Sequence, residues 1–241
     1  MDTILIVKTG STMDDLKARK GDFEDWILAG MGMERKNARI IDVQDGAPLP
    51  SPQGLRGIVI TGSHAMVTEH HEWSRQAARW VKHAVGTAVP ILGICFGHQL
   101  IAHALGGVVG DNPNGREFGT VDVRLNYKAG RDPLFRGLPQ TIRVHASHTQ
   151  SVLTLPPGAR VLASSAMDPH HAFVWEDRVW GVQFHPEFDA EITKAYIEAY
   201  RTDLQAGGND VDTLLRSCED TPYGTALLMR FSRIVEKDSK G

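Results

Sequence analysis

Cysteine is scarce in this sequence, with only Cys95 and Cys218 among 241 residues. That scarcity excludes a small scaffold held together by disulfides. A bridge between the two cysteines stays an alternative, although cytosolic proteins rarely keep one. No apolar run approaches the roughly 18 residues of a membrane-spanning helix, and no basic start with an apolar core marks an export signal. We therefore expect a cytoplasmic protein without a membrane partner.

Charge of one sign is also lacking, because 26 basic residues face 29 acidic ones and the net charge is −3. That balance predicts no nucleic-acid partner. The apolar fraction of 41% and the charged fraction of 23% are typical of a globular protein with a sizeable core. No internal repeat is present. We expect a main domain over residues 1–205 and a short helical appendage over residues 206–241.

Buried-strand patterns alternate with helical patterns over residues 3–105. Apolar runs predict strands at 3–7, 38–43, 57–60 and after Pro90, with helical spacing between them at 23–27 and 73–84. Such alternation predicts an α/β fold with a mostly parallel central sheet covered by helices on both faces. Shorter runs then predict a small antiparallel or mixed extension, with strands at 121–125, 142–145, 160–163, 172–175 and 179–184. A helix capped by Asp189 follows.

The segment GICFGHQ at residues 93–99 interrupts a strand pattern and opens a helical one. A strand, a sharp turn with Cys95 at its apex and a helix form a nucleophile elbow. Gly93 and Gly97 lack side chains, so the strand and the helix can pass close together. The helix N-terminus stabilises a thiolate. A buried structural thiol is the alternative for Cys95.

A thiolate nucleophile needs a proton-transferring neighbour, and residues 185–187 offer one. Alternate residues of an extended segment point the same way, so Glu187 can hold one nitrogen of His185 and leave the other to face the sulfur. Thr61, Gly62 and Ser63 follow a second predicted strand. Because sites in parallel sheets lie at the carboxyl ends of the strands, we expect this segment to meet Cys95.

These segments resemble the class I glutamine amidotransferase family over residues 3–200, most of all the amidotransferase half of GMP synthases and its stand-alone relatives. GICFGHQ matches the nucleophile motif of the family, and GVQFHPE at residues 181–187 matches its histidine–glutamate motif. The resemblance implies attack of Cys95 on the side-chain amide of glutamine, with His185 and Glu187 completing the triad. It implies an oxyanion hole at Phe96, Gly62 and Ser63, substrate contacts at Gln99, His148, Thr149 and Gln150, and no cofactor.

Two positions depart from the family pattern. Ser63 stands where the family has a glycine, and a serine adopts unusual dihedral angles less freely. Gln150 stands where the family has a carboxylate that contacts the charged ends of the substrate, so an ammonium group loses a charge-assisted partner. The substrate is therefore left open between glutamine and another γ-glutamyl amide or peptide.

Several alternatives remain open. The chain carries no glycine-rich phosphate loop, so a glutaminase that delivers ammonia would need a partner in the form of a separate synthase subunit. A free-standing γ-glutamyl hydrolase would need none, and a catalytically silent binding protein would keep only the fold. A cysteine peptidase would use His98 instead of His185, although a histidine one helical turn after the elbow is expected beneath the site. A homodimer is a further partner that the sequence leaves open.

Paired histidines invite a metal interpretation, at His70 and His71, at His170 and His171, and at His145 and His148. No thiolate or carboxylate accompanies them at ligand spacing, so the sequence predicts no metal site. Glu117 matches a family segment near the site and is expected to have a structural role first. The apolar face at residues 227–235 predicts a C-terminal helix that packs on the domain, with docking of a partner or a second copy as the alternative.

Overall fold

The computed structural model describes residues 3–238. Nine strands form one mixed sheet in the order β2-β1-β3-β4-β11-β10-β9-β6-β7, and β5 pairs with β8 in a separate ribbon. The strands are β1 Ile4–Lys8, β2 Ala38–Asp42, β3 Gly57–Ile60, β4 Ile91–Ile94, β5 Val108–Asp111, β6 Glu117–Leu125, β7 Thr141–His148, β8 Gln150–Thr154, β9 Arg160–Ser164, β10 Ala172–Trp175 and β11 Val179–Val182.

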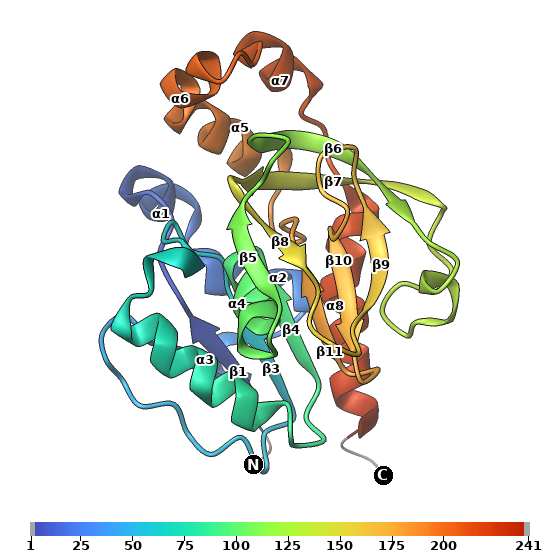
Figure 1. The fold of residues 1–241 in the computed structure, drawn as a ribbon. Coiled ribbons are helices and arrows are strands. Elements are labelled where there is room, and N and C mark those ends of the chain that lie inside the picture. The colour runs from blue at the N-terminus through green and yellow to red at the C-terminus, as the bar shows by residue number, and fades with distance from the viewer. Residues whose placement is uncertain (1–2, 239–241) are drawn as a thin grey trace.

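Eight α-helices surround these strands in the described part of the chain (Figure 1). They are α1 Asp14–Lys20, α2 Phe23–Met31, α3 Glu72–Ala84, α4 Phe96–Ala104, α5 Ala190–Ala199, α6 Arg201–Ala206, α7 Val211–Ser217 and α8 Pro222–Asp238. Three short 3-10 turns are η1 Arg35–Asn37, η2 Val67–Glu69 and η3 Ala129–Arg131. None of the described helices is long and apolar enough to cross a membrane.

Strand β1 shows why the parallel half is buried on both faces. Its residues Ile4 and Ile6 belong to one hydrophobic cluster, whereas Leu5 and Val7 belong to another. The first cluster includes residues of α2 and α8, and the second includes residues of α3 and α4. Since side chains alternate along a strand, a run that is apolar at every position needs helices on both sides. The predicted α/β fold with a helix-covered parallel core is confirmed.

The second half of the chain continues the central sheet. Strands β6, β7, β9 and β10 are antiparallel to their neighbours, as expected of a mixed extension. Strand β11 differs, because it lies parallel to β4 in the central sheet and ends at Val182 rather than at residue 184. The ribbon of β5 and β8 was not predicted, since β5 is largely exposed and lacks an apolar run.

Helix α8 packs on the domain. Leu227, Leu228, Phe231 and Val235 are buried in the cluster that α2 and β1 share. A methyl group at Gly30 in α2 would collide with Leu228, so the two helices are in close contact. The apolar face of α8 is therefore covered by the chain itself. The division of the chain into residues 1–205 and 206–241 stays a prediction.

Candidate active site

Cys95 lies in the turn between β4 and α4, with φ of 50° and ψ of −103°. A residue other than glycine in the left-handed region stores about 1–3 kcal/mol of strain. Two backbone hydrogen bonds hold the turn: the Cys95 N–H donates to the Val182 carbonyl at 2.9 Å, and the Gly97 N–H donates to the Thr61 carbonyl at 3.2 Å. The turn is thus tied to both strands that flank β4.

The two glycines around Cys95 are required by space. A methyl group at Gly93 would lie 2.5 Å from the Gly97 carbonyl carbon. A methyl group at Gly97 would collide with the carbonyl oxygen of Ile60. Both obstacles are backbone atoms of packed elements, so they cannot turn aside as a flexible side chain can. The strand–turn–helix arrangement that the sequence predicts is present.

His185 and Glu187 form a buried pair just beyond the end of β11. His185 Nδ1 donates to Glu187 Oε1 at 2.8 Å, and the two side chains are 3% and 0% exposed. The imidazole ring stacks on Phe188, with centroids 4.0 Å apart and an interplanar angle of 16°. The ring is therefore oriented by a hydrogen bond at one edge and by packing on its face.

The electrostatics of His185 favour its charged form. Burial alone lowers the pKa of His185, but the Glu187 carboxylate and the Cys95 sulfur together raise it to about 10. An opposite charge at contact distance favours the protonated imidazole. The ring is thus positively charged at neutral pH, which stabilises a thiolate beside it.

A chain of amides reaches Cys95 from the other side. Gln183 Nε2 donates to the Cys95 sulfur at 3.6 Å, and its Oε1 accepts from Gln99 Nε2 at 3.0 Å. Gln99 Nε2 also donates to the Gln150 carbonyl at 2.8 Å. Gln183 is fully buried. No separate sequence signal marks Gln183, because an amide next to the histidine motif has many ordinary roles.

One cavity of about 260 Å³ brings most of the predicted site residues together. Glu187 and Gly62 do not line it: Glu187 lies behind His185, and Gly62 directly precedes Ser63. The cavity is lined by Phe23, Ser63, His64, Ala65, Met66, Cys95, Phe96, Gln99, Arg116, Phe118, Ser147, His148, Thr149, Gln150, His185, Tyr196, Tyr200 and Asp203.

The outer wall of the cavity comes from elements that the sequence did not connect with the site. Tyr196 and Tyr200 belong to α5 and its end, and α6 supplies Asp203, which pairs with Arg116 at 3.3 Å. His64 Nδ1 and the Tyr200 hydroxyl are 2.9 Å apart. Helices α5 and α6 gather at one end of the sheet (Figure 1). Their apolar spacing predicted helices and carried no signal of a role at the cavity.

The segment at residues 61–63 is held by Thr9. The Thr9 hydroxyl lies 2.9 Å from both the Thr61 and the Gly62 carbonyl oxygens, and the Thr9 N–H donates to the Thr61 hydroxyl at 3.0 Å. Ser63 is not among the residues with positive φ. The serine that replaces the family glycine therefore adds no backbone strain in this conformation.

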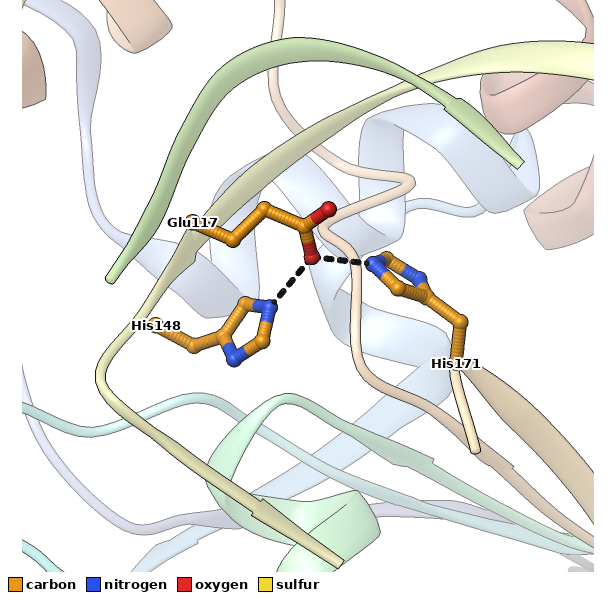
Figure 2. A group of neighbouring side chains, drawn as sticks. All are labelled: Glu117, His148 and His171. Carbon is orange, nitrogen blue, oxygen red and sulfur yellow. Dashed lines mark hydrogen bonds and ion pairs between the residues drawn. The ribbon is translucent and has the colours of Figure 1, made fainter. Parts of the chain in front are cut away.

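A buried carboxylate joins two histidines next to the cavity (Figure 2). Glu117 Oε2 accepts from His148 Nε2 and from His171 Nε2, both at 2.8 Å. His148 Nδ1 donates to the Gln150 carbonyl at 3.0 Å. Burial alone raises the pKa of Glu117, but the hydrogen bonds from the two histidines lower it well below its usual range.

This cluster corrects one part of the sequence argument. A carboxylate does accompany two of the histidines at ligand distance, because Glu117, His148 and His171 have ligand atoms within 4.8 Å of one another. Such a set is chemically suited to a metal ion. Here the two Nε2 atoms and Oε2 are already joined by hydrogen bonds, which account for the arrangement without an ion. The prediction that the protein binds no metal stays a prediction.

Two other sequence alternatives meet the structure at His98 and Cys218. His98 is fully buried and packs on Phe173, with ring centroids 4.9 Å apart, and it does not line the cavity. Burial lowers its pKa to about 3. Cys218 is free and buried, and so is Cys95. The expected position of His98 beneath the site is confirmed, and the two cysteines are not bridged.

Fold and site together define an α/β protein in which an elbow cysteine and a histidine–glutamate pair meet at the carboxyl edge of the sheet. Residues 32–200 match the family model described as glutamine amidotransferase class-I. The chain belongs to the class I glutamine amidotransferase family, as its motifs indicated.

Sequence relatives point in the same direction. The chain is 36% identical over 146 residues to one subunit of the glutamine-hydrolyzing GMP synthase of Sulfurisphaera tokodaii, and the match covers 60% of this chain and 72% of that protein. It is 40% identical over 132 residues to the GMP synthase of Thermomicrobium roseum, covering 55% of this chain and 23% of that one. The chain thus spans about a quarter of the length of the full GMP synthases that it matches.

Solved structures share the fold. A glutamine amidotransferase from Thermotoga maritima superposes with a TM-score of 0.77 at 24% identity, covering 98% of this chain and 99% of that one. A GMP synthase subunit from Thermoplasma acidophilum gives a TM-score of 0.68 at 23% identity, covering 100% and 96%. These likenesses extend over the whole described chain, including the C-terminal helices.

Proposed function

We propose that this protein hydrolyses the side-chain amide of glutamine through a glutamyl thioester on Cys95. The observation that carries the proposal is that Cys95 and the charged imidazole of His185 line one cavity, with Glu187 holding the ring. Membership of the amidotransferase family supports glutamine as the substrate. No cofactor takes part in this chemistry.

The reaction follows triad logic. The Cys95 thiolate attacks the amide carbon and forms a tetrahedral intermediate. Collapse of the intermediate breaks the carbon–nitrogen bond, and His185 gives its proton to the departing ammonia. The neutral His185 then takes a proton from a water molecule, which attacks the thioester and releases glutamate and the Cys95 thiol. Glu187 keeps the ring in place through both steps.

Two backbone N–H groups are suited to the oxyanion. In a trans peptide the N–H points opposite to the carbonyl. The Gly62 carbonyl is bound by Thr9, so the Ser63 N–H faces away from Thr9. The Cys95 carbonyl accepts from the Gln99 N–H at 3.1 Å, so the Phe96 N–H points out of the N-terminus of α4. Losing one such donor typically slows a reaction about 100- to 1000-fold.

Gln150 offers an acceptor to the amino group of the substrate. Its Nε2 donates to the Thr68 hydroxyl at 2.7 Å and to Asp111 Oδ1 at 3.0 Å. Its Oε1 is buried and has no hydrogen-bond partner among the described residues. An ammonium group could donate to this oxygen, with the Asp111 carboxylate behind it. With Gln99, His148 and Thr149 in the same lining, Gln150 replaces the family carboxylate without abolishing the subsite.

A separate synthase subunit is the proposed acceptor of the ammonia. The relative from Sulfurisphaera tokodaii is by name one subunit of a GMP synthase, so such a protein functions beside another chain. We extend this arrangement to the present protein. Action in the cytoplasm and the formation of a homodimer remain proposals of the same kind.

A second candidate is a free-standing hydrolase of γ-glutamyl amides, and the outer wall of the cavity favours it. Phe118, Tyr196 and Tyr200 line that wall together with the Arg116–Asp203 pair. Ammonia needs no aromatic surface, whereas an amine with an apolar body would gain from one. The catalytic residues would be the same, because the attack occurs at the same carbon.

The experiment is to incubate the purified protein with glutamine and with γ-glutamyl amides of alkyl and aryl amines. Ammonia or amine release and the intact mass of the protein are recorded for wild type, Cys95→Ala and Cys218→Ala. We expect turnover and a glutamyl adduct in wild type and Cys218→Ala, and neither in Cys95→Ala. Turnover that survives in Cys95→Ala contradicts the proposal.

The outcome across substrates separates the two candidates. Release of ammonia from glutamine supports the amidotransferase function. Release of amines only, with glutamine left intact, supports the free-standing hydrolase. The absence of any adduct in wild type, even when a candidate synthase subunit is present, would leave a binding protein.

A further inference from the structure

A second cavity, of about 450 Å³, lies at the other end of β11 from His185. It opens between α8 and the turn that precedes β11. Seven residues separate Arg178, which lines this cavity, from His185, so the two sites are roughly 20 Å apart along an extended chain. This cavity therefore does not belong to the site around Cys95.

Positive charge dominates the lining of this cavity. Helix α8 contributes Arg230, Arg233 and Lys237, which recur at a spacing of three and four residues and so share one face. Arg136 from the segment after η3 and Arg178 complete the basic set. Five cationic side chains thus surround one concave surface, although the whole protein carries a net charge of −3.

Carboxylates do not neutralise most of this charge. Among the described residues, the only acidic one in the lining is Asp177, and it pairs with Arg160, outside the cavity. Arg136, Arg230 and Arg233 have no ion pair with any described carboxylate. Like charges placed together without counterions disfavour the folded state, so the cluster indicates a function other than stability.

Arg230 forms a fixed centre for the cluster. Its Nη1 donates to the Leu134 carbonyl at 3.2 Å and to the Arg136 carbonyl at 2.6 Å, so the guanidinium group is held in one orientation. Burial lowers the pKa of Arg230, and the charges of Arg136 and Arg233 lower it further. The three guanidinium groups are therefore close enough to repel one another, and an anion between them would relieve that repulsion.

We propose that this cavity binds a phosphorylated small molecule. Guanidinium groups present planar forks of donors that match the oxygens of a phosphate, and three or more of them suit a group with several negative charges. The rest of the lining is apolar, with Pro133, Trp180 and Ile234. These side chains suit the organic part of the ligand, and the volume accommodates a molecule of nucleotide size.

The test is calorimetric titration of the full chain with tripolyphosphate and with ATP, at constant ionic strength. The variant is the pair Arg136→Gln and Arg233→Gln, because both side chains are exposed and neither guanidinium group is hydrogen-bonded to a described residue. We expect saturable binding by wild type and a loss of affinity of about tenfold or more in the double variant, since each arginine supplies a charge-assisted hydrogen bond. Arg230→Gln serves as a second variant.

Arg39→Gln is the matched control, because it removes one exposed arginine on β2, away from the cavity. It should bind like wild type, and so should Cys95→Ala, because the proposal does not depend on catalysis. Equal affinities for tripolyphosphate and ATP identify a polyphosphate site, and tighter binding of ATP adds a contact to the organic part. Absence of saturable binding by wild type, or equal affinities of wild type and the double variant, overturns the proposal.

Discussion

Gln183 Nε2 lies 3.6 Å from the sulfur of Cys95 and donates a hydrogen bond to it. The same amide accepts from Gln99, which in turn donates to the carbonyl that His148 also binds. The sulfur is thus the end point of a buried hydrogen-bonded chain that starts at Glu117. The position of the sulfur depends on buried side chains as well as on the elbow.

Replacement of Gln183 by leucine tests this chain. The variant removes the donor to the sulfur and leaves the amide of Gln99 with one acceptor fewer. We expect alkylation of Cys95 by iodoacetamide at pH 7 and turnover of glutamine to slow about tenfold, as for the loss of one hydrogen bond to a charged group. Gln53→Leu, in an exposed loop, is the control. Unchanged alkylation in a folded Gln183→Leu protein would argue against the role of Gln183.

The ion pair of His185 predicts a pH dependence of stability. Its pKa of about 10 in the folded protein lies above the value of about 6.5 in an unfolded chain. The stabilisation is therefore fully present below about pH 6.5 and is lost as the pH rises towards 10. In Glu187→Gln the main cause of the raised pKa is gone, so this loss should shrink.

Urea denaturation at pH 6 and pH 9.5 measures the effect. Wild type should lose more free energy of unfolding between these pH values than Glu187→Gln does. The exposed Glu191→Gln change should leave the wild-type dependence intact. Parallel pH profiles for wild type and Glu187→Gln would show that the pair contributes no such stability.

Gly97 predicts a steric penalty. In Gly97→Ala the new methyl group meets the backbone of β3, so β3 or α4 must shift. We expect the free energy of unfolding to fall by roughly 2 kcal/mol or more, as for overpacking in a closely packed region. Gly130→Ala is the matched control, because nothing lies within 4 Å of its added methyl group. Equal melting temperatures of the two variants would contradict the close approach at the elbow.

Glu117 predicts the opposite pH dependence to His185. Its pKa is lowered by His148 and His171, so its stabilisation is present above about pH 4.3 and is lost as the pH falls further. Glu117→Gln should lower the free energy of unfolding at pH 7 by about 3 kcal/mol, because two buried histidines lose their charged partner. It should also flatten the acid limb of the stability curve. The surface change Glu34→Gln should do neither, and an unaltered acid limb in Glu117→Gln would refute the pairing.

Local sequence accounts for most of the elements and for the parts of the site that are made within a few residues. Gly93, Cys95 and Gly97 define the elbow because the close approach of strand and helix depends on side chains two positions away. His185 and Glu187 meet because they flank one proline. Apolar runs such as residues 57–60 predict buried strands because both faces of a parallel sheet must be covered.

Contacts between distant residues depend on the tertiary structure. Glu117 joins His148 and His171 across separations of 31 and 54 residues, and Gln183 reaches Cys95 across 88. These contacts depend on the order of strands, above all on the insertion of β11 beside β4. Hydrophobic periodicity shows which face of a strand is buried, but it carries no information about which strand lies alongside. The aromatic wall of the cavity and the basic cavity beside α8 follow from the same packing.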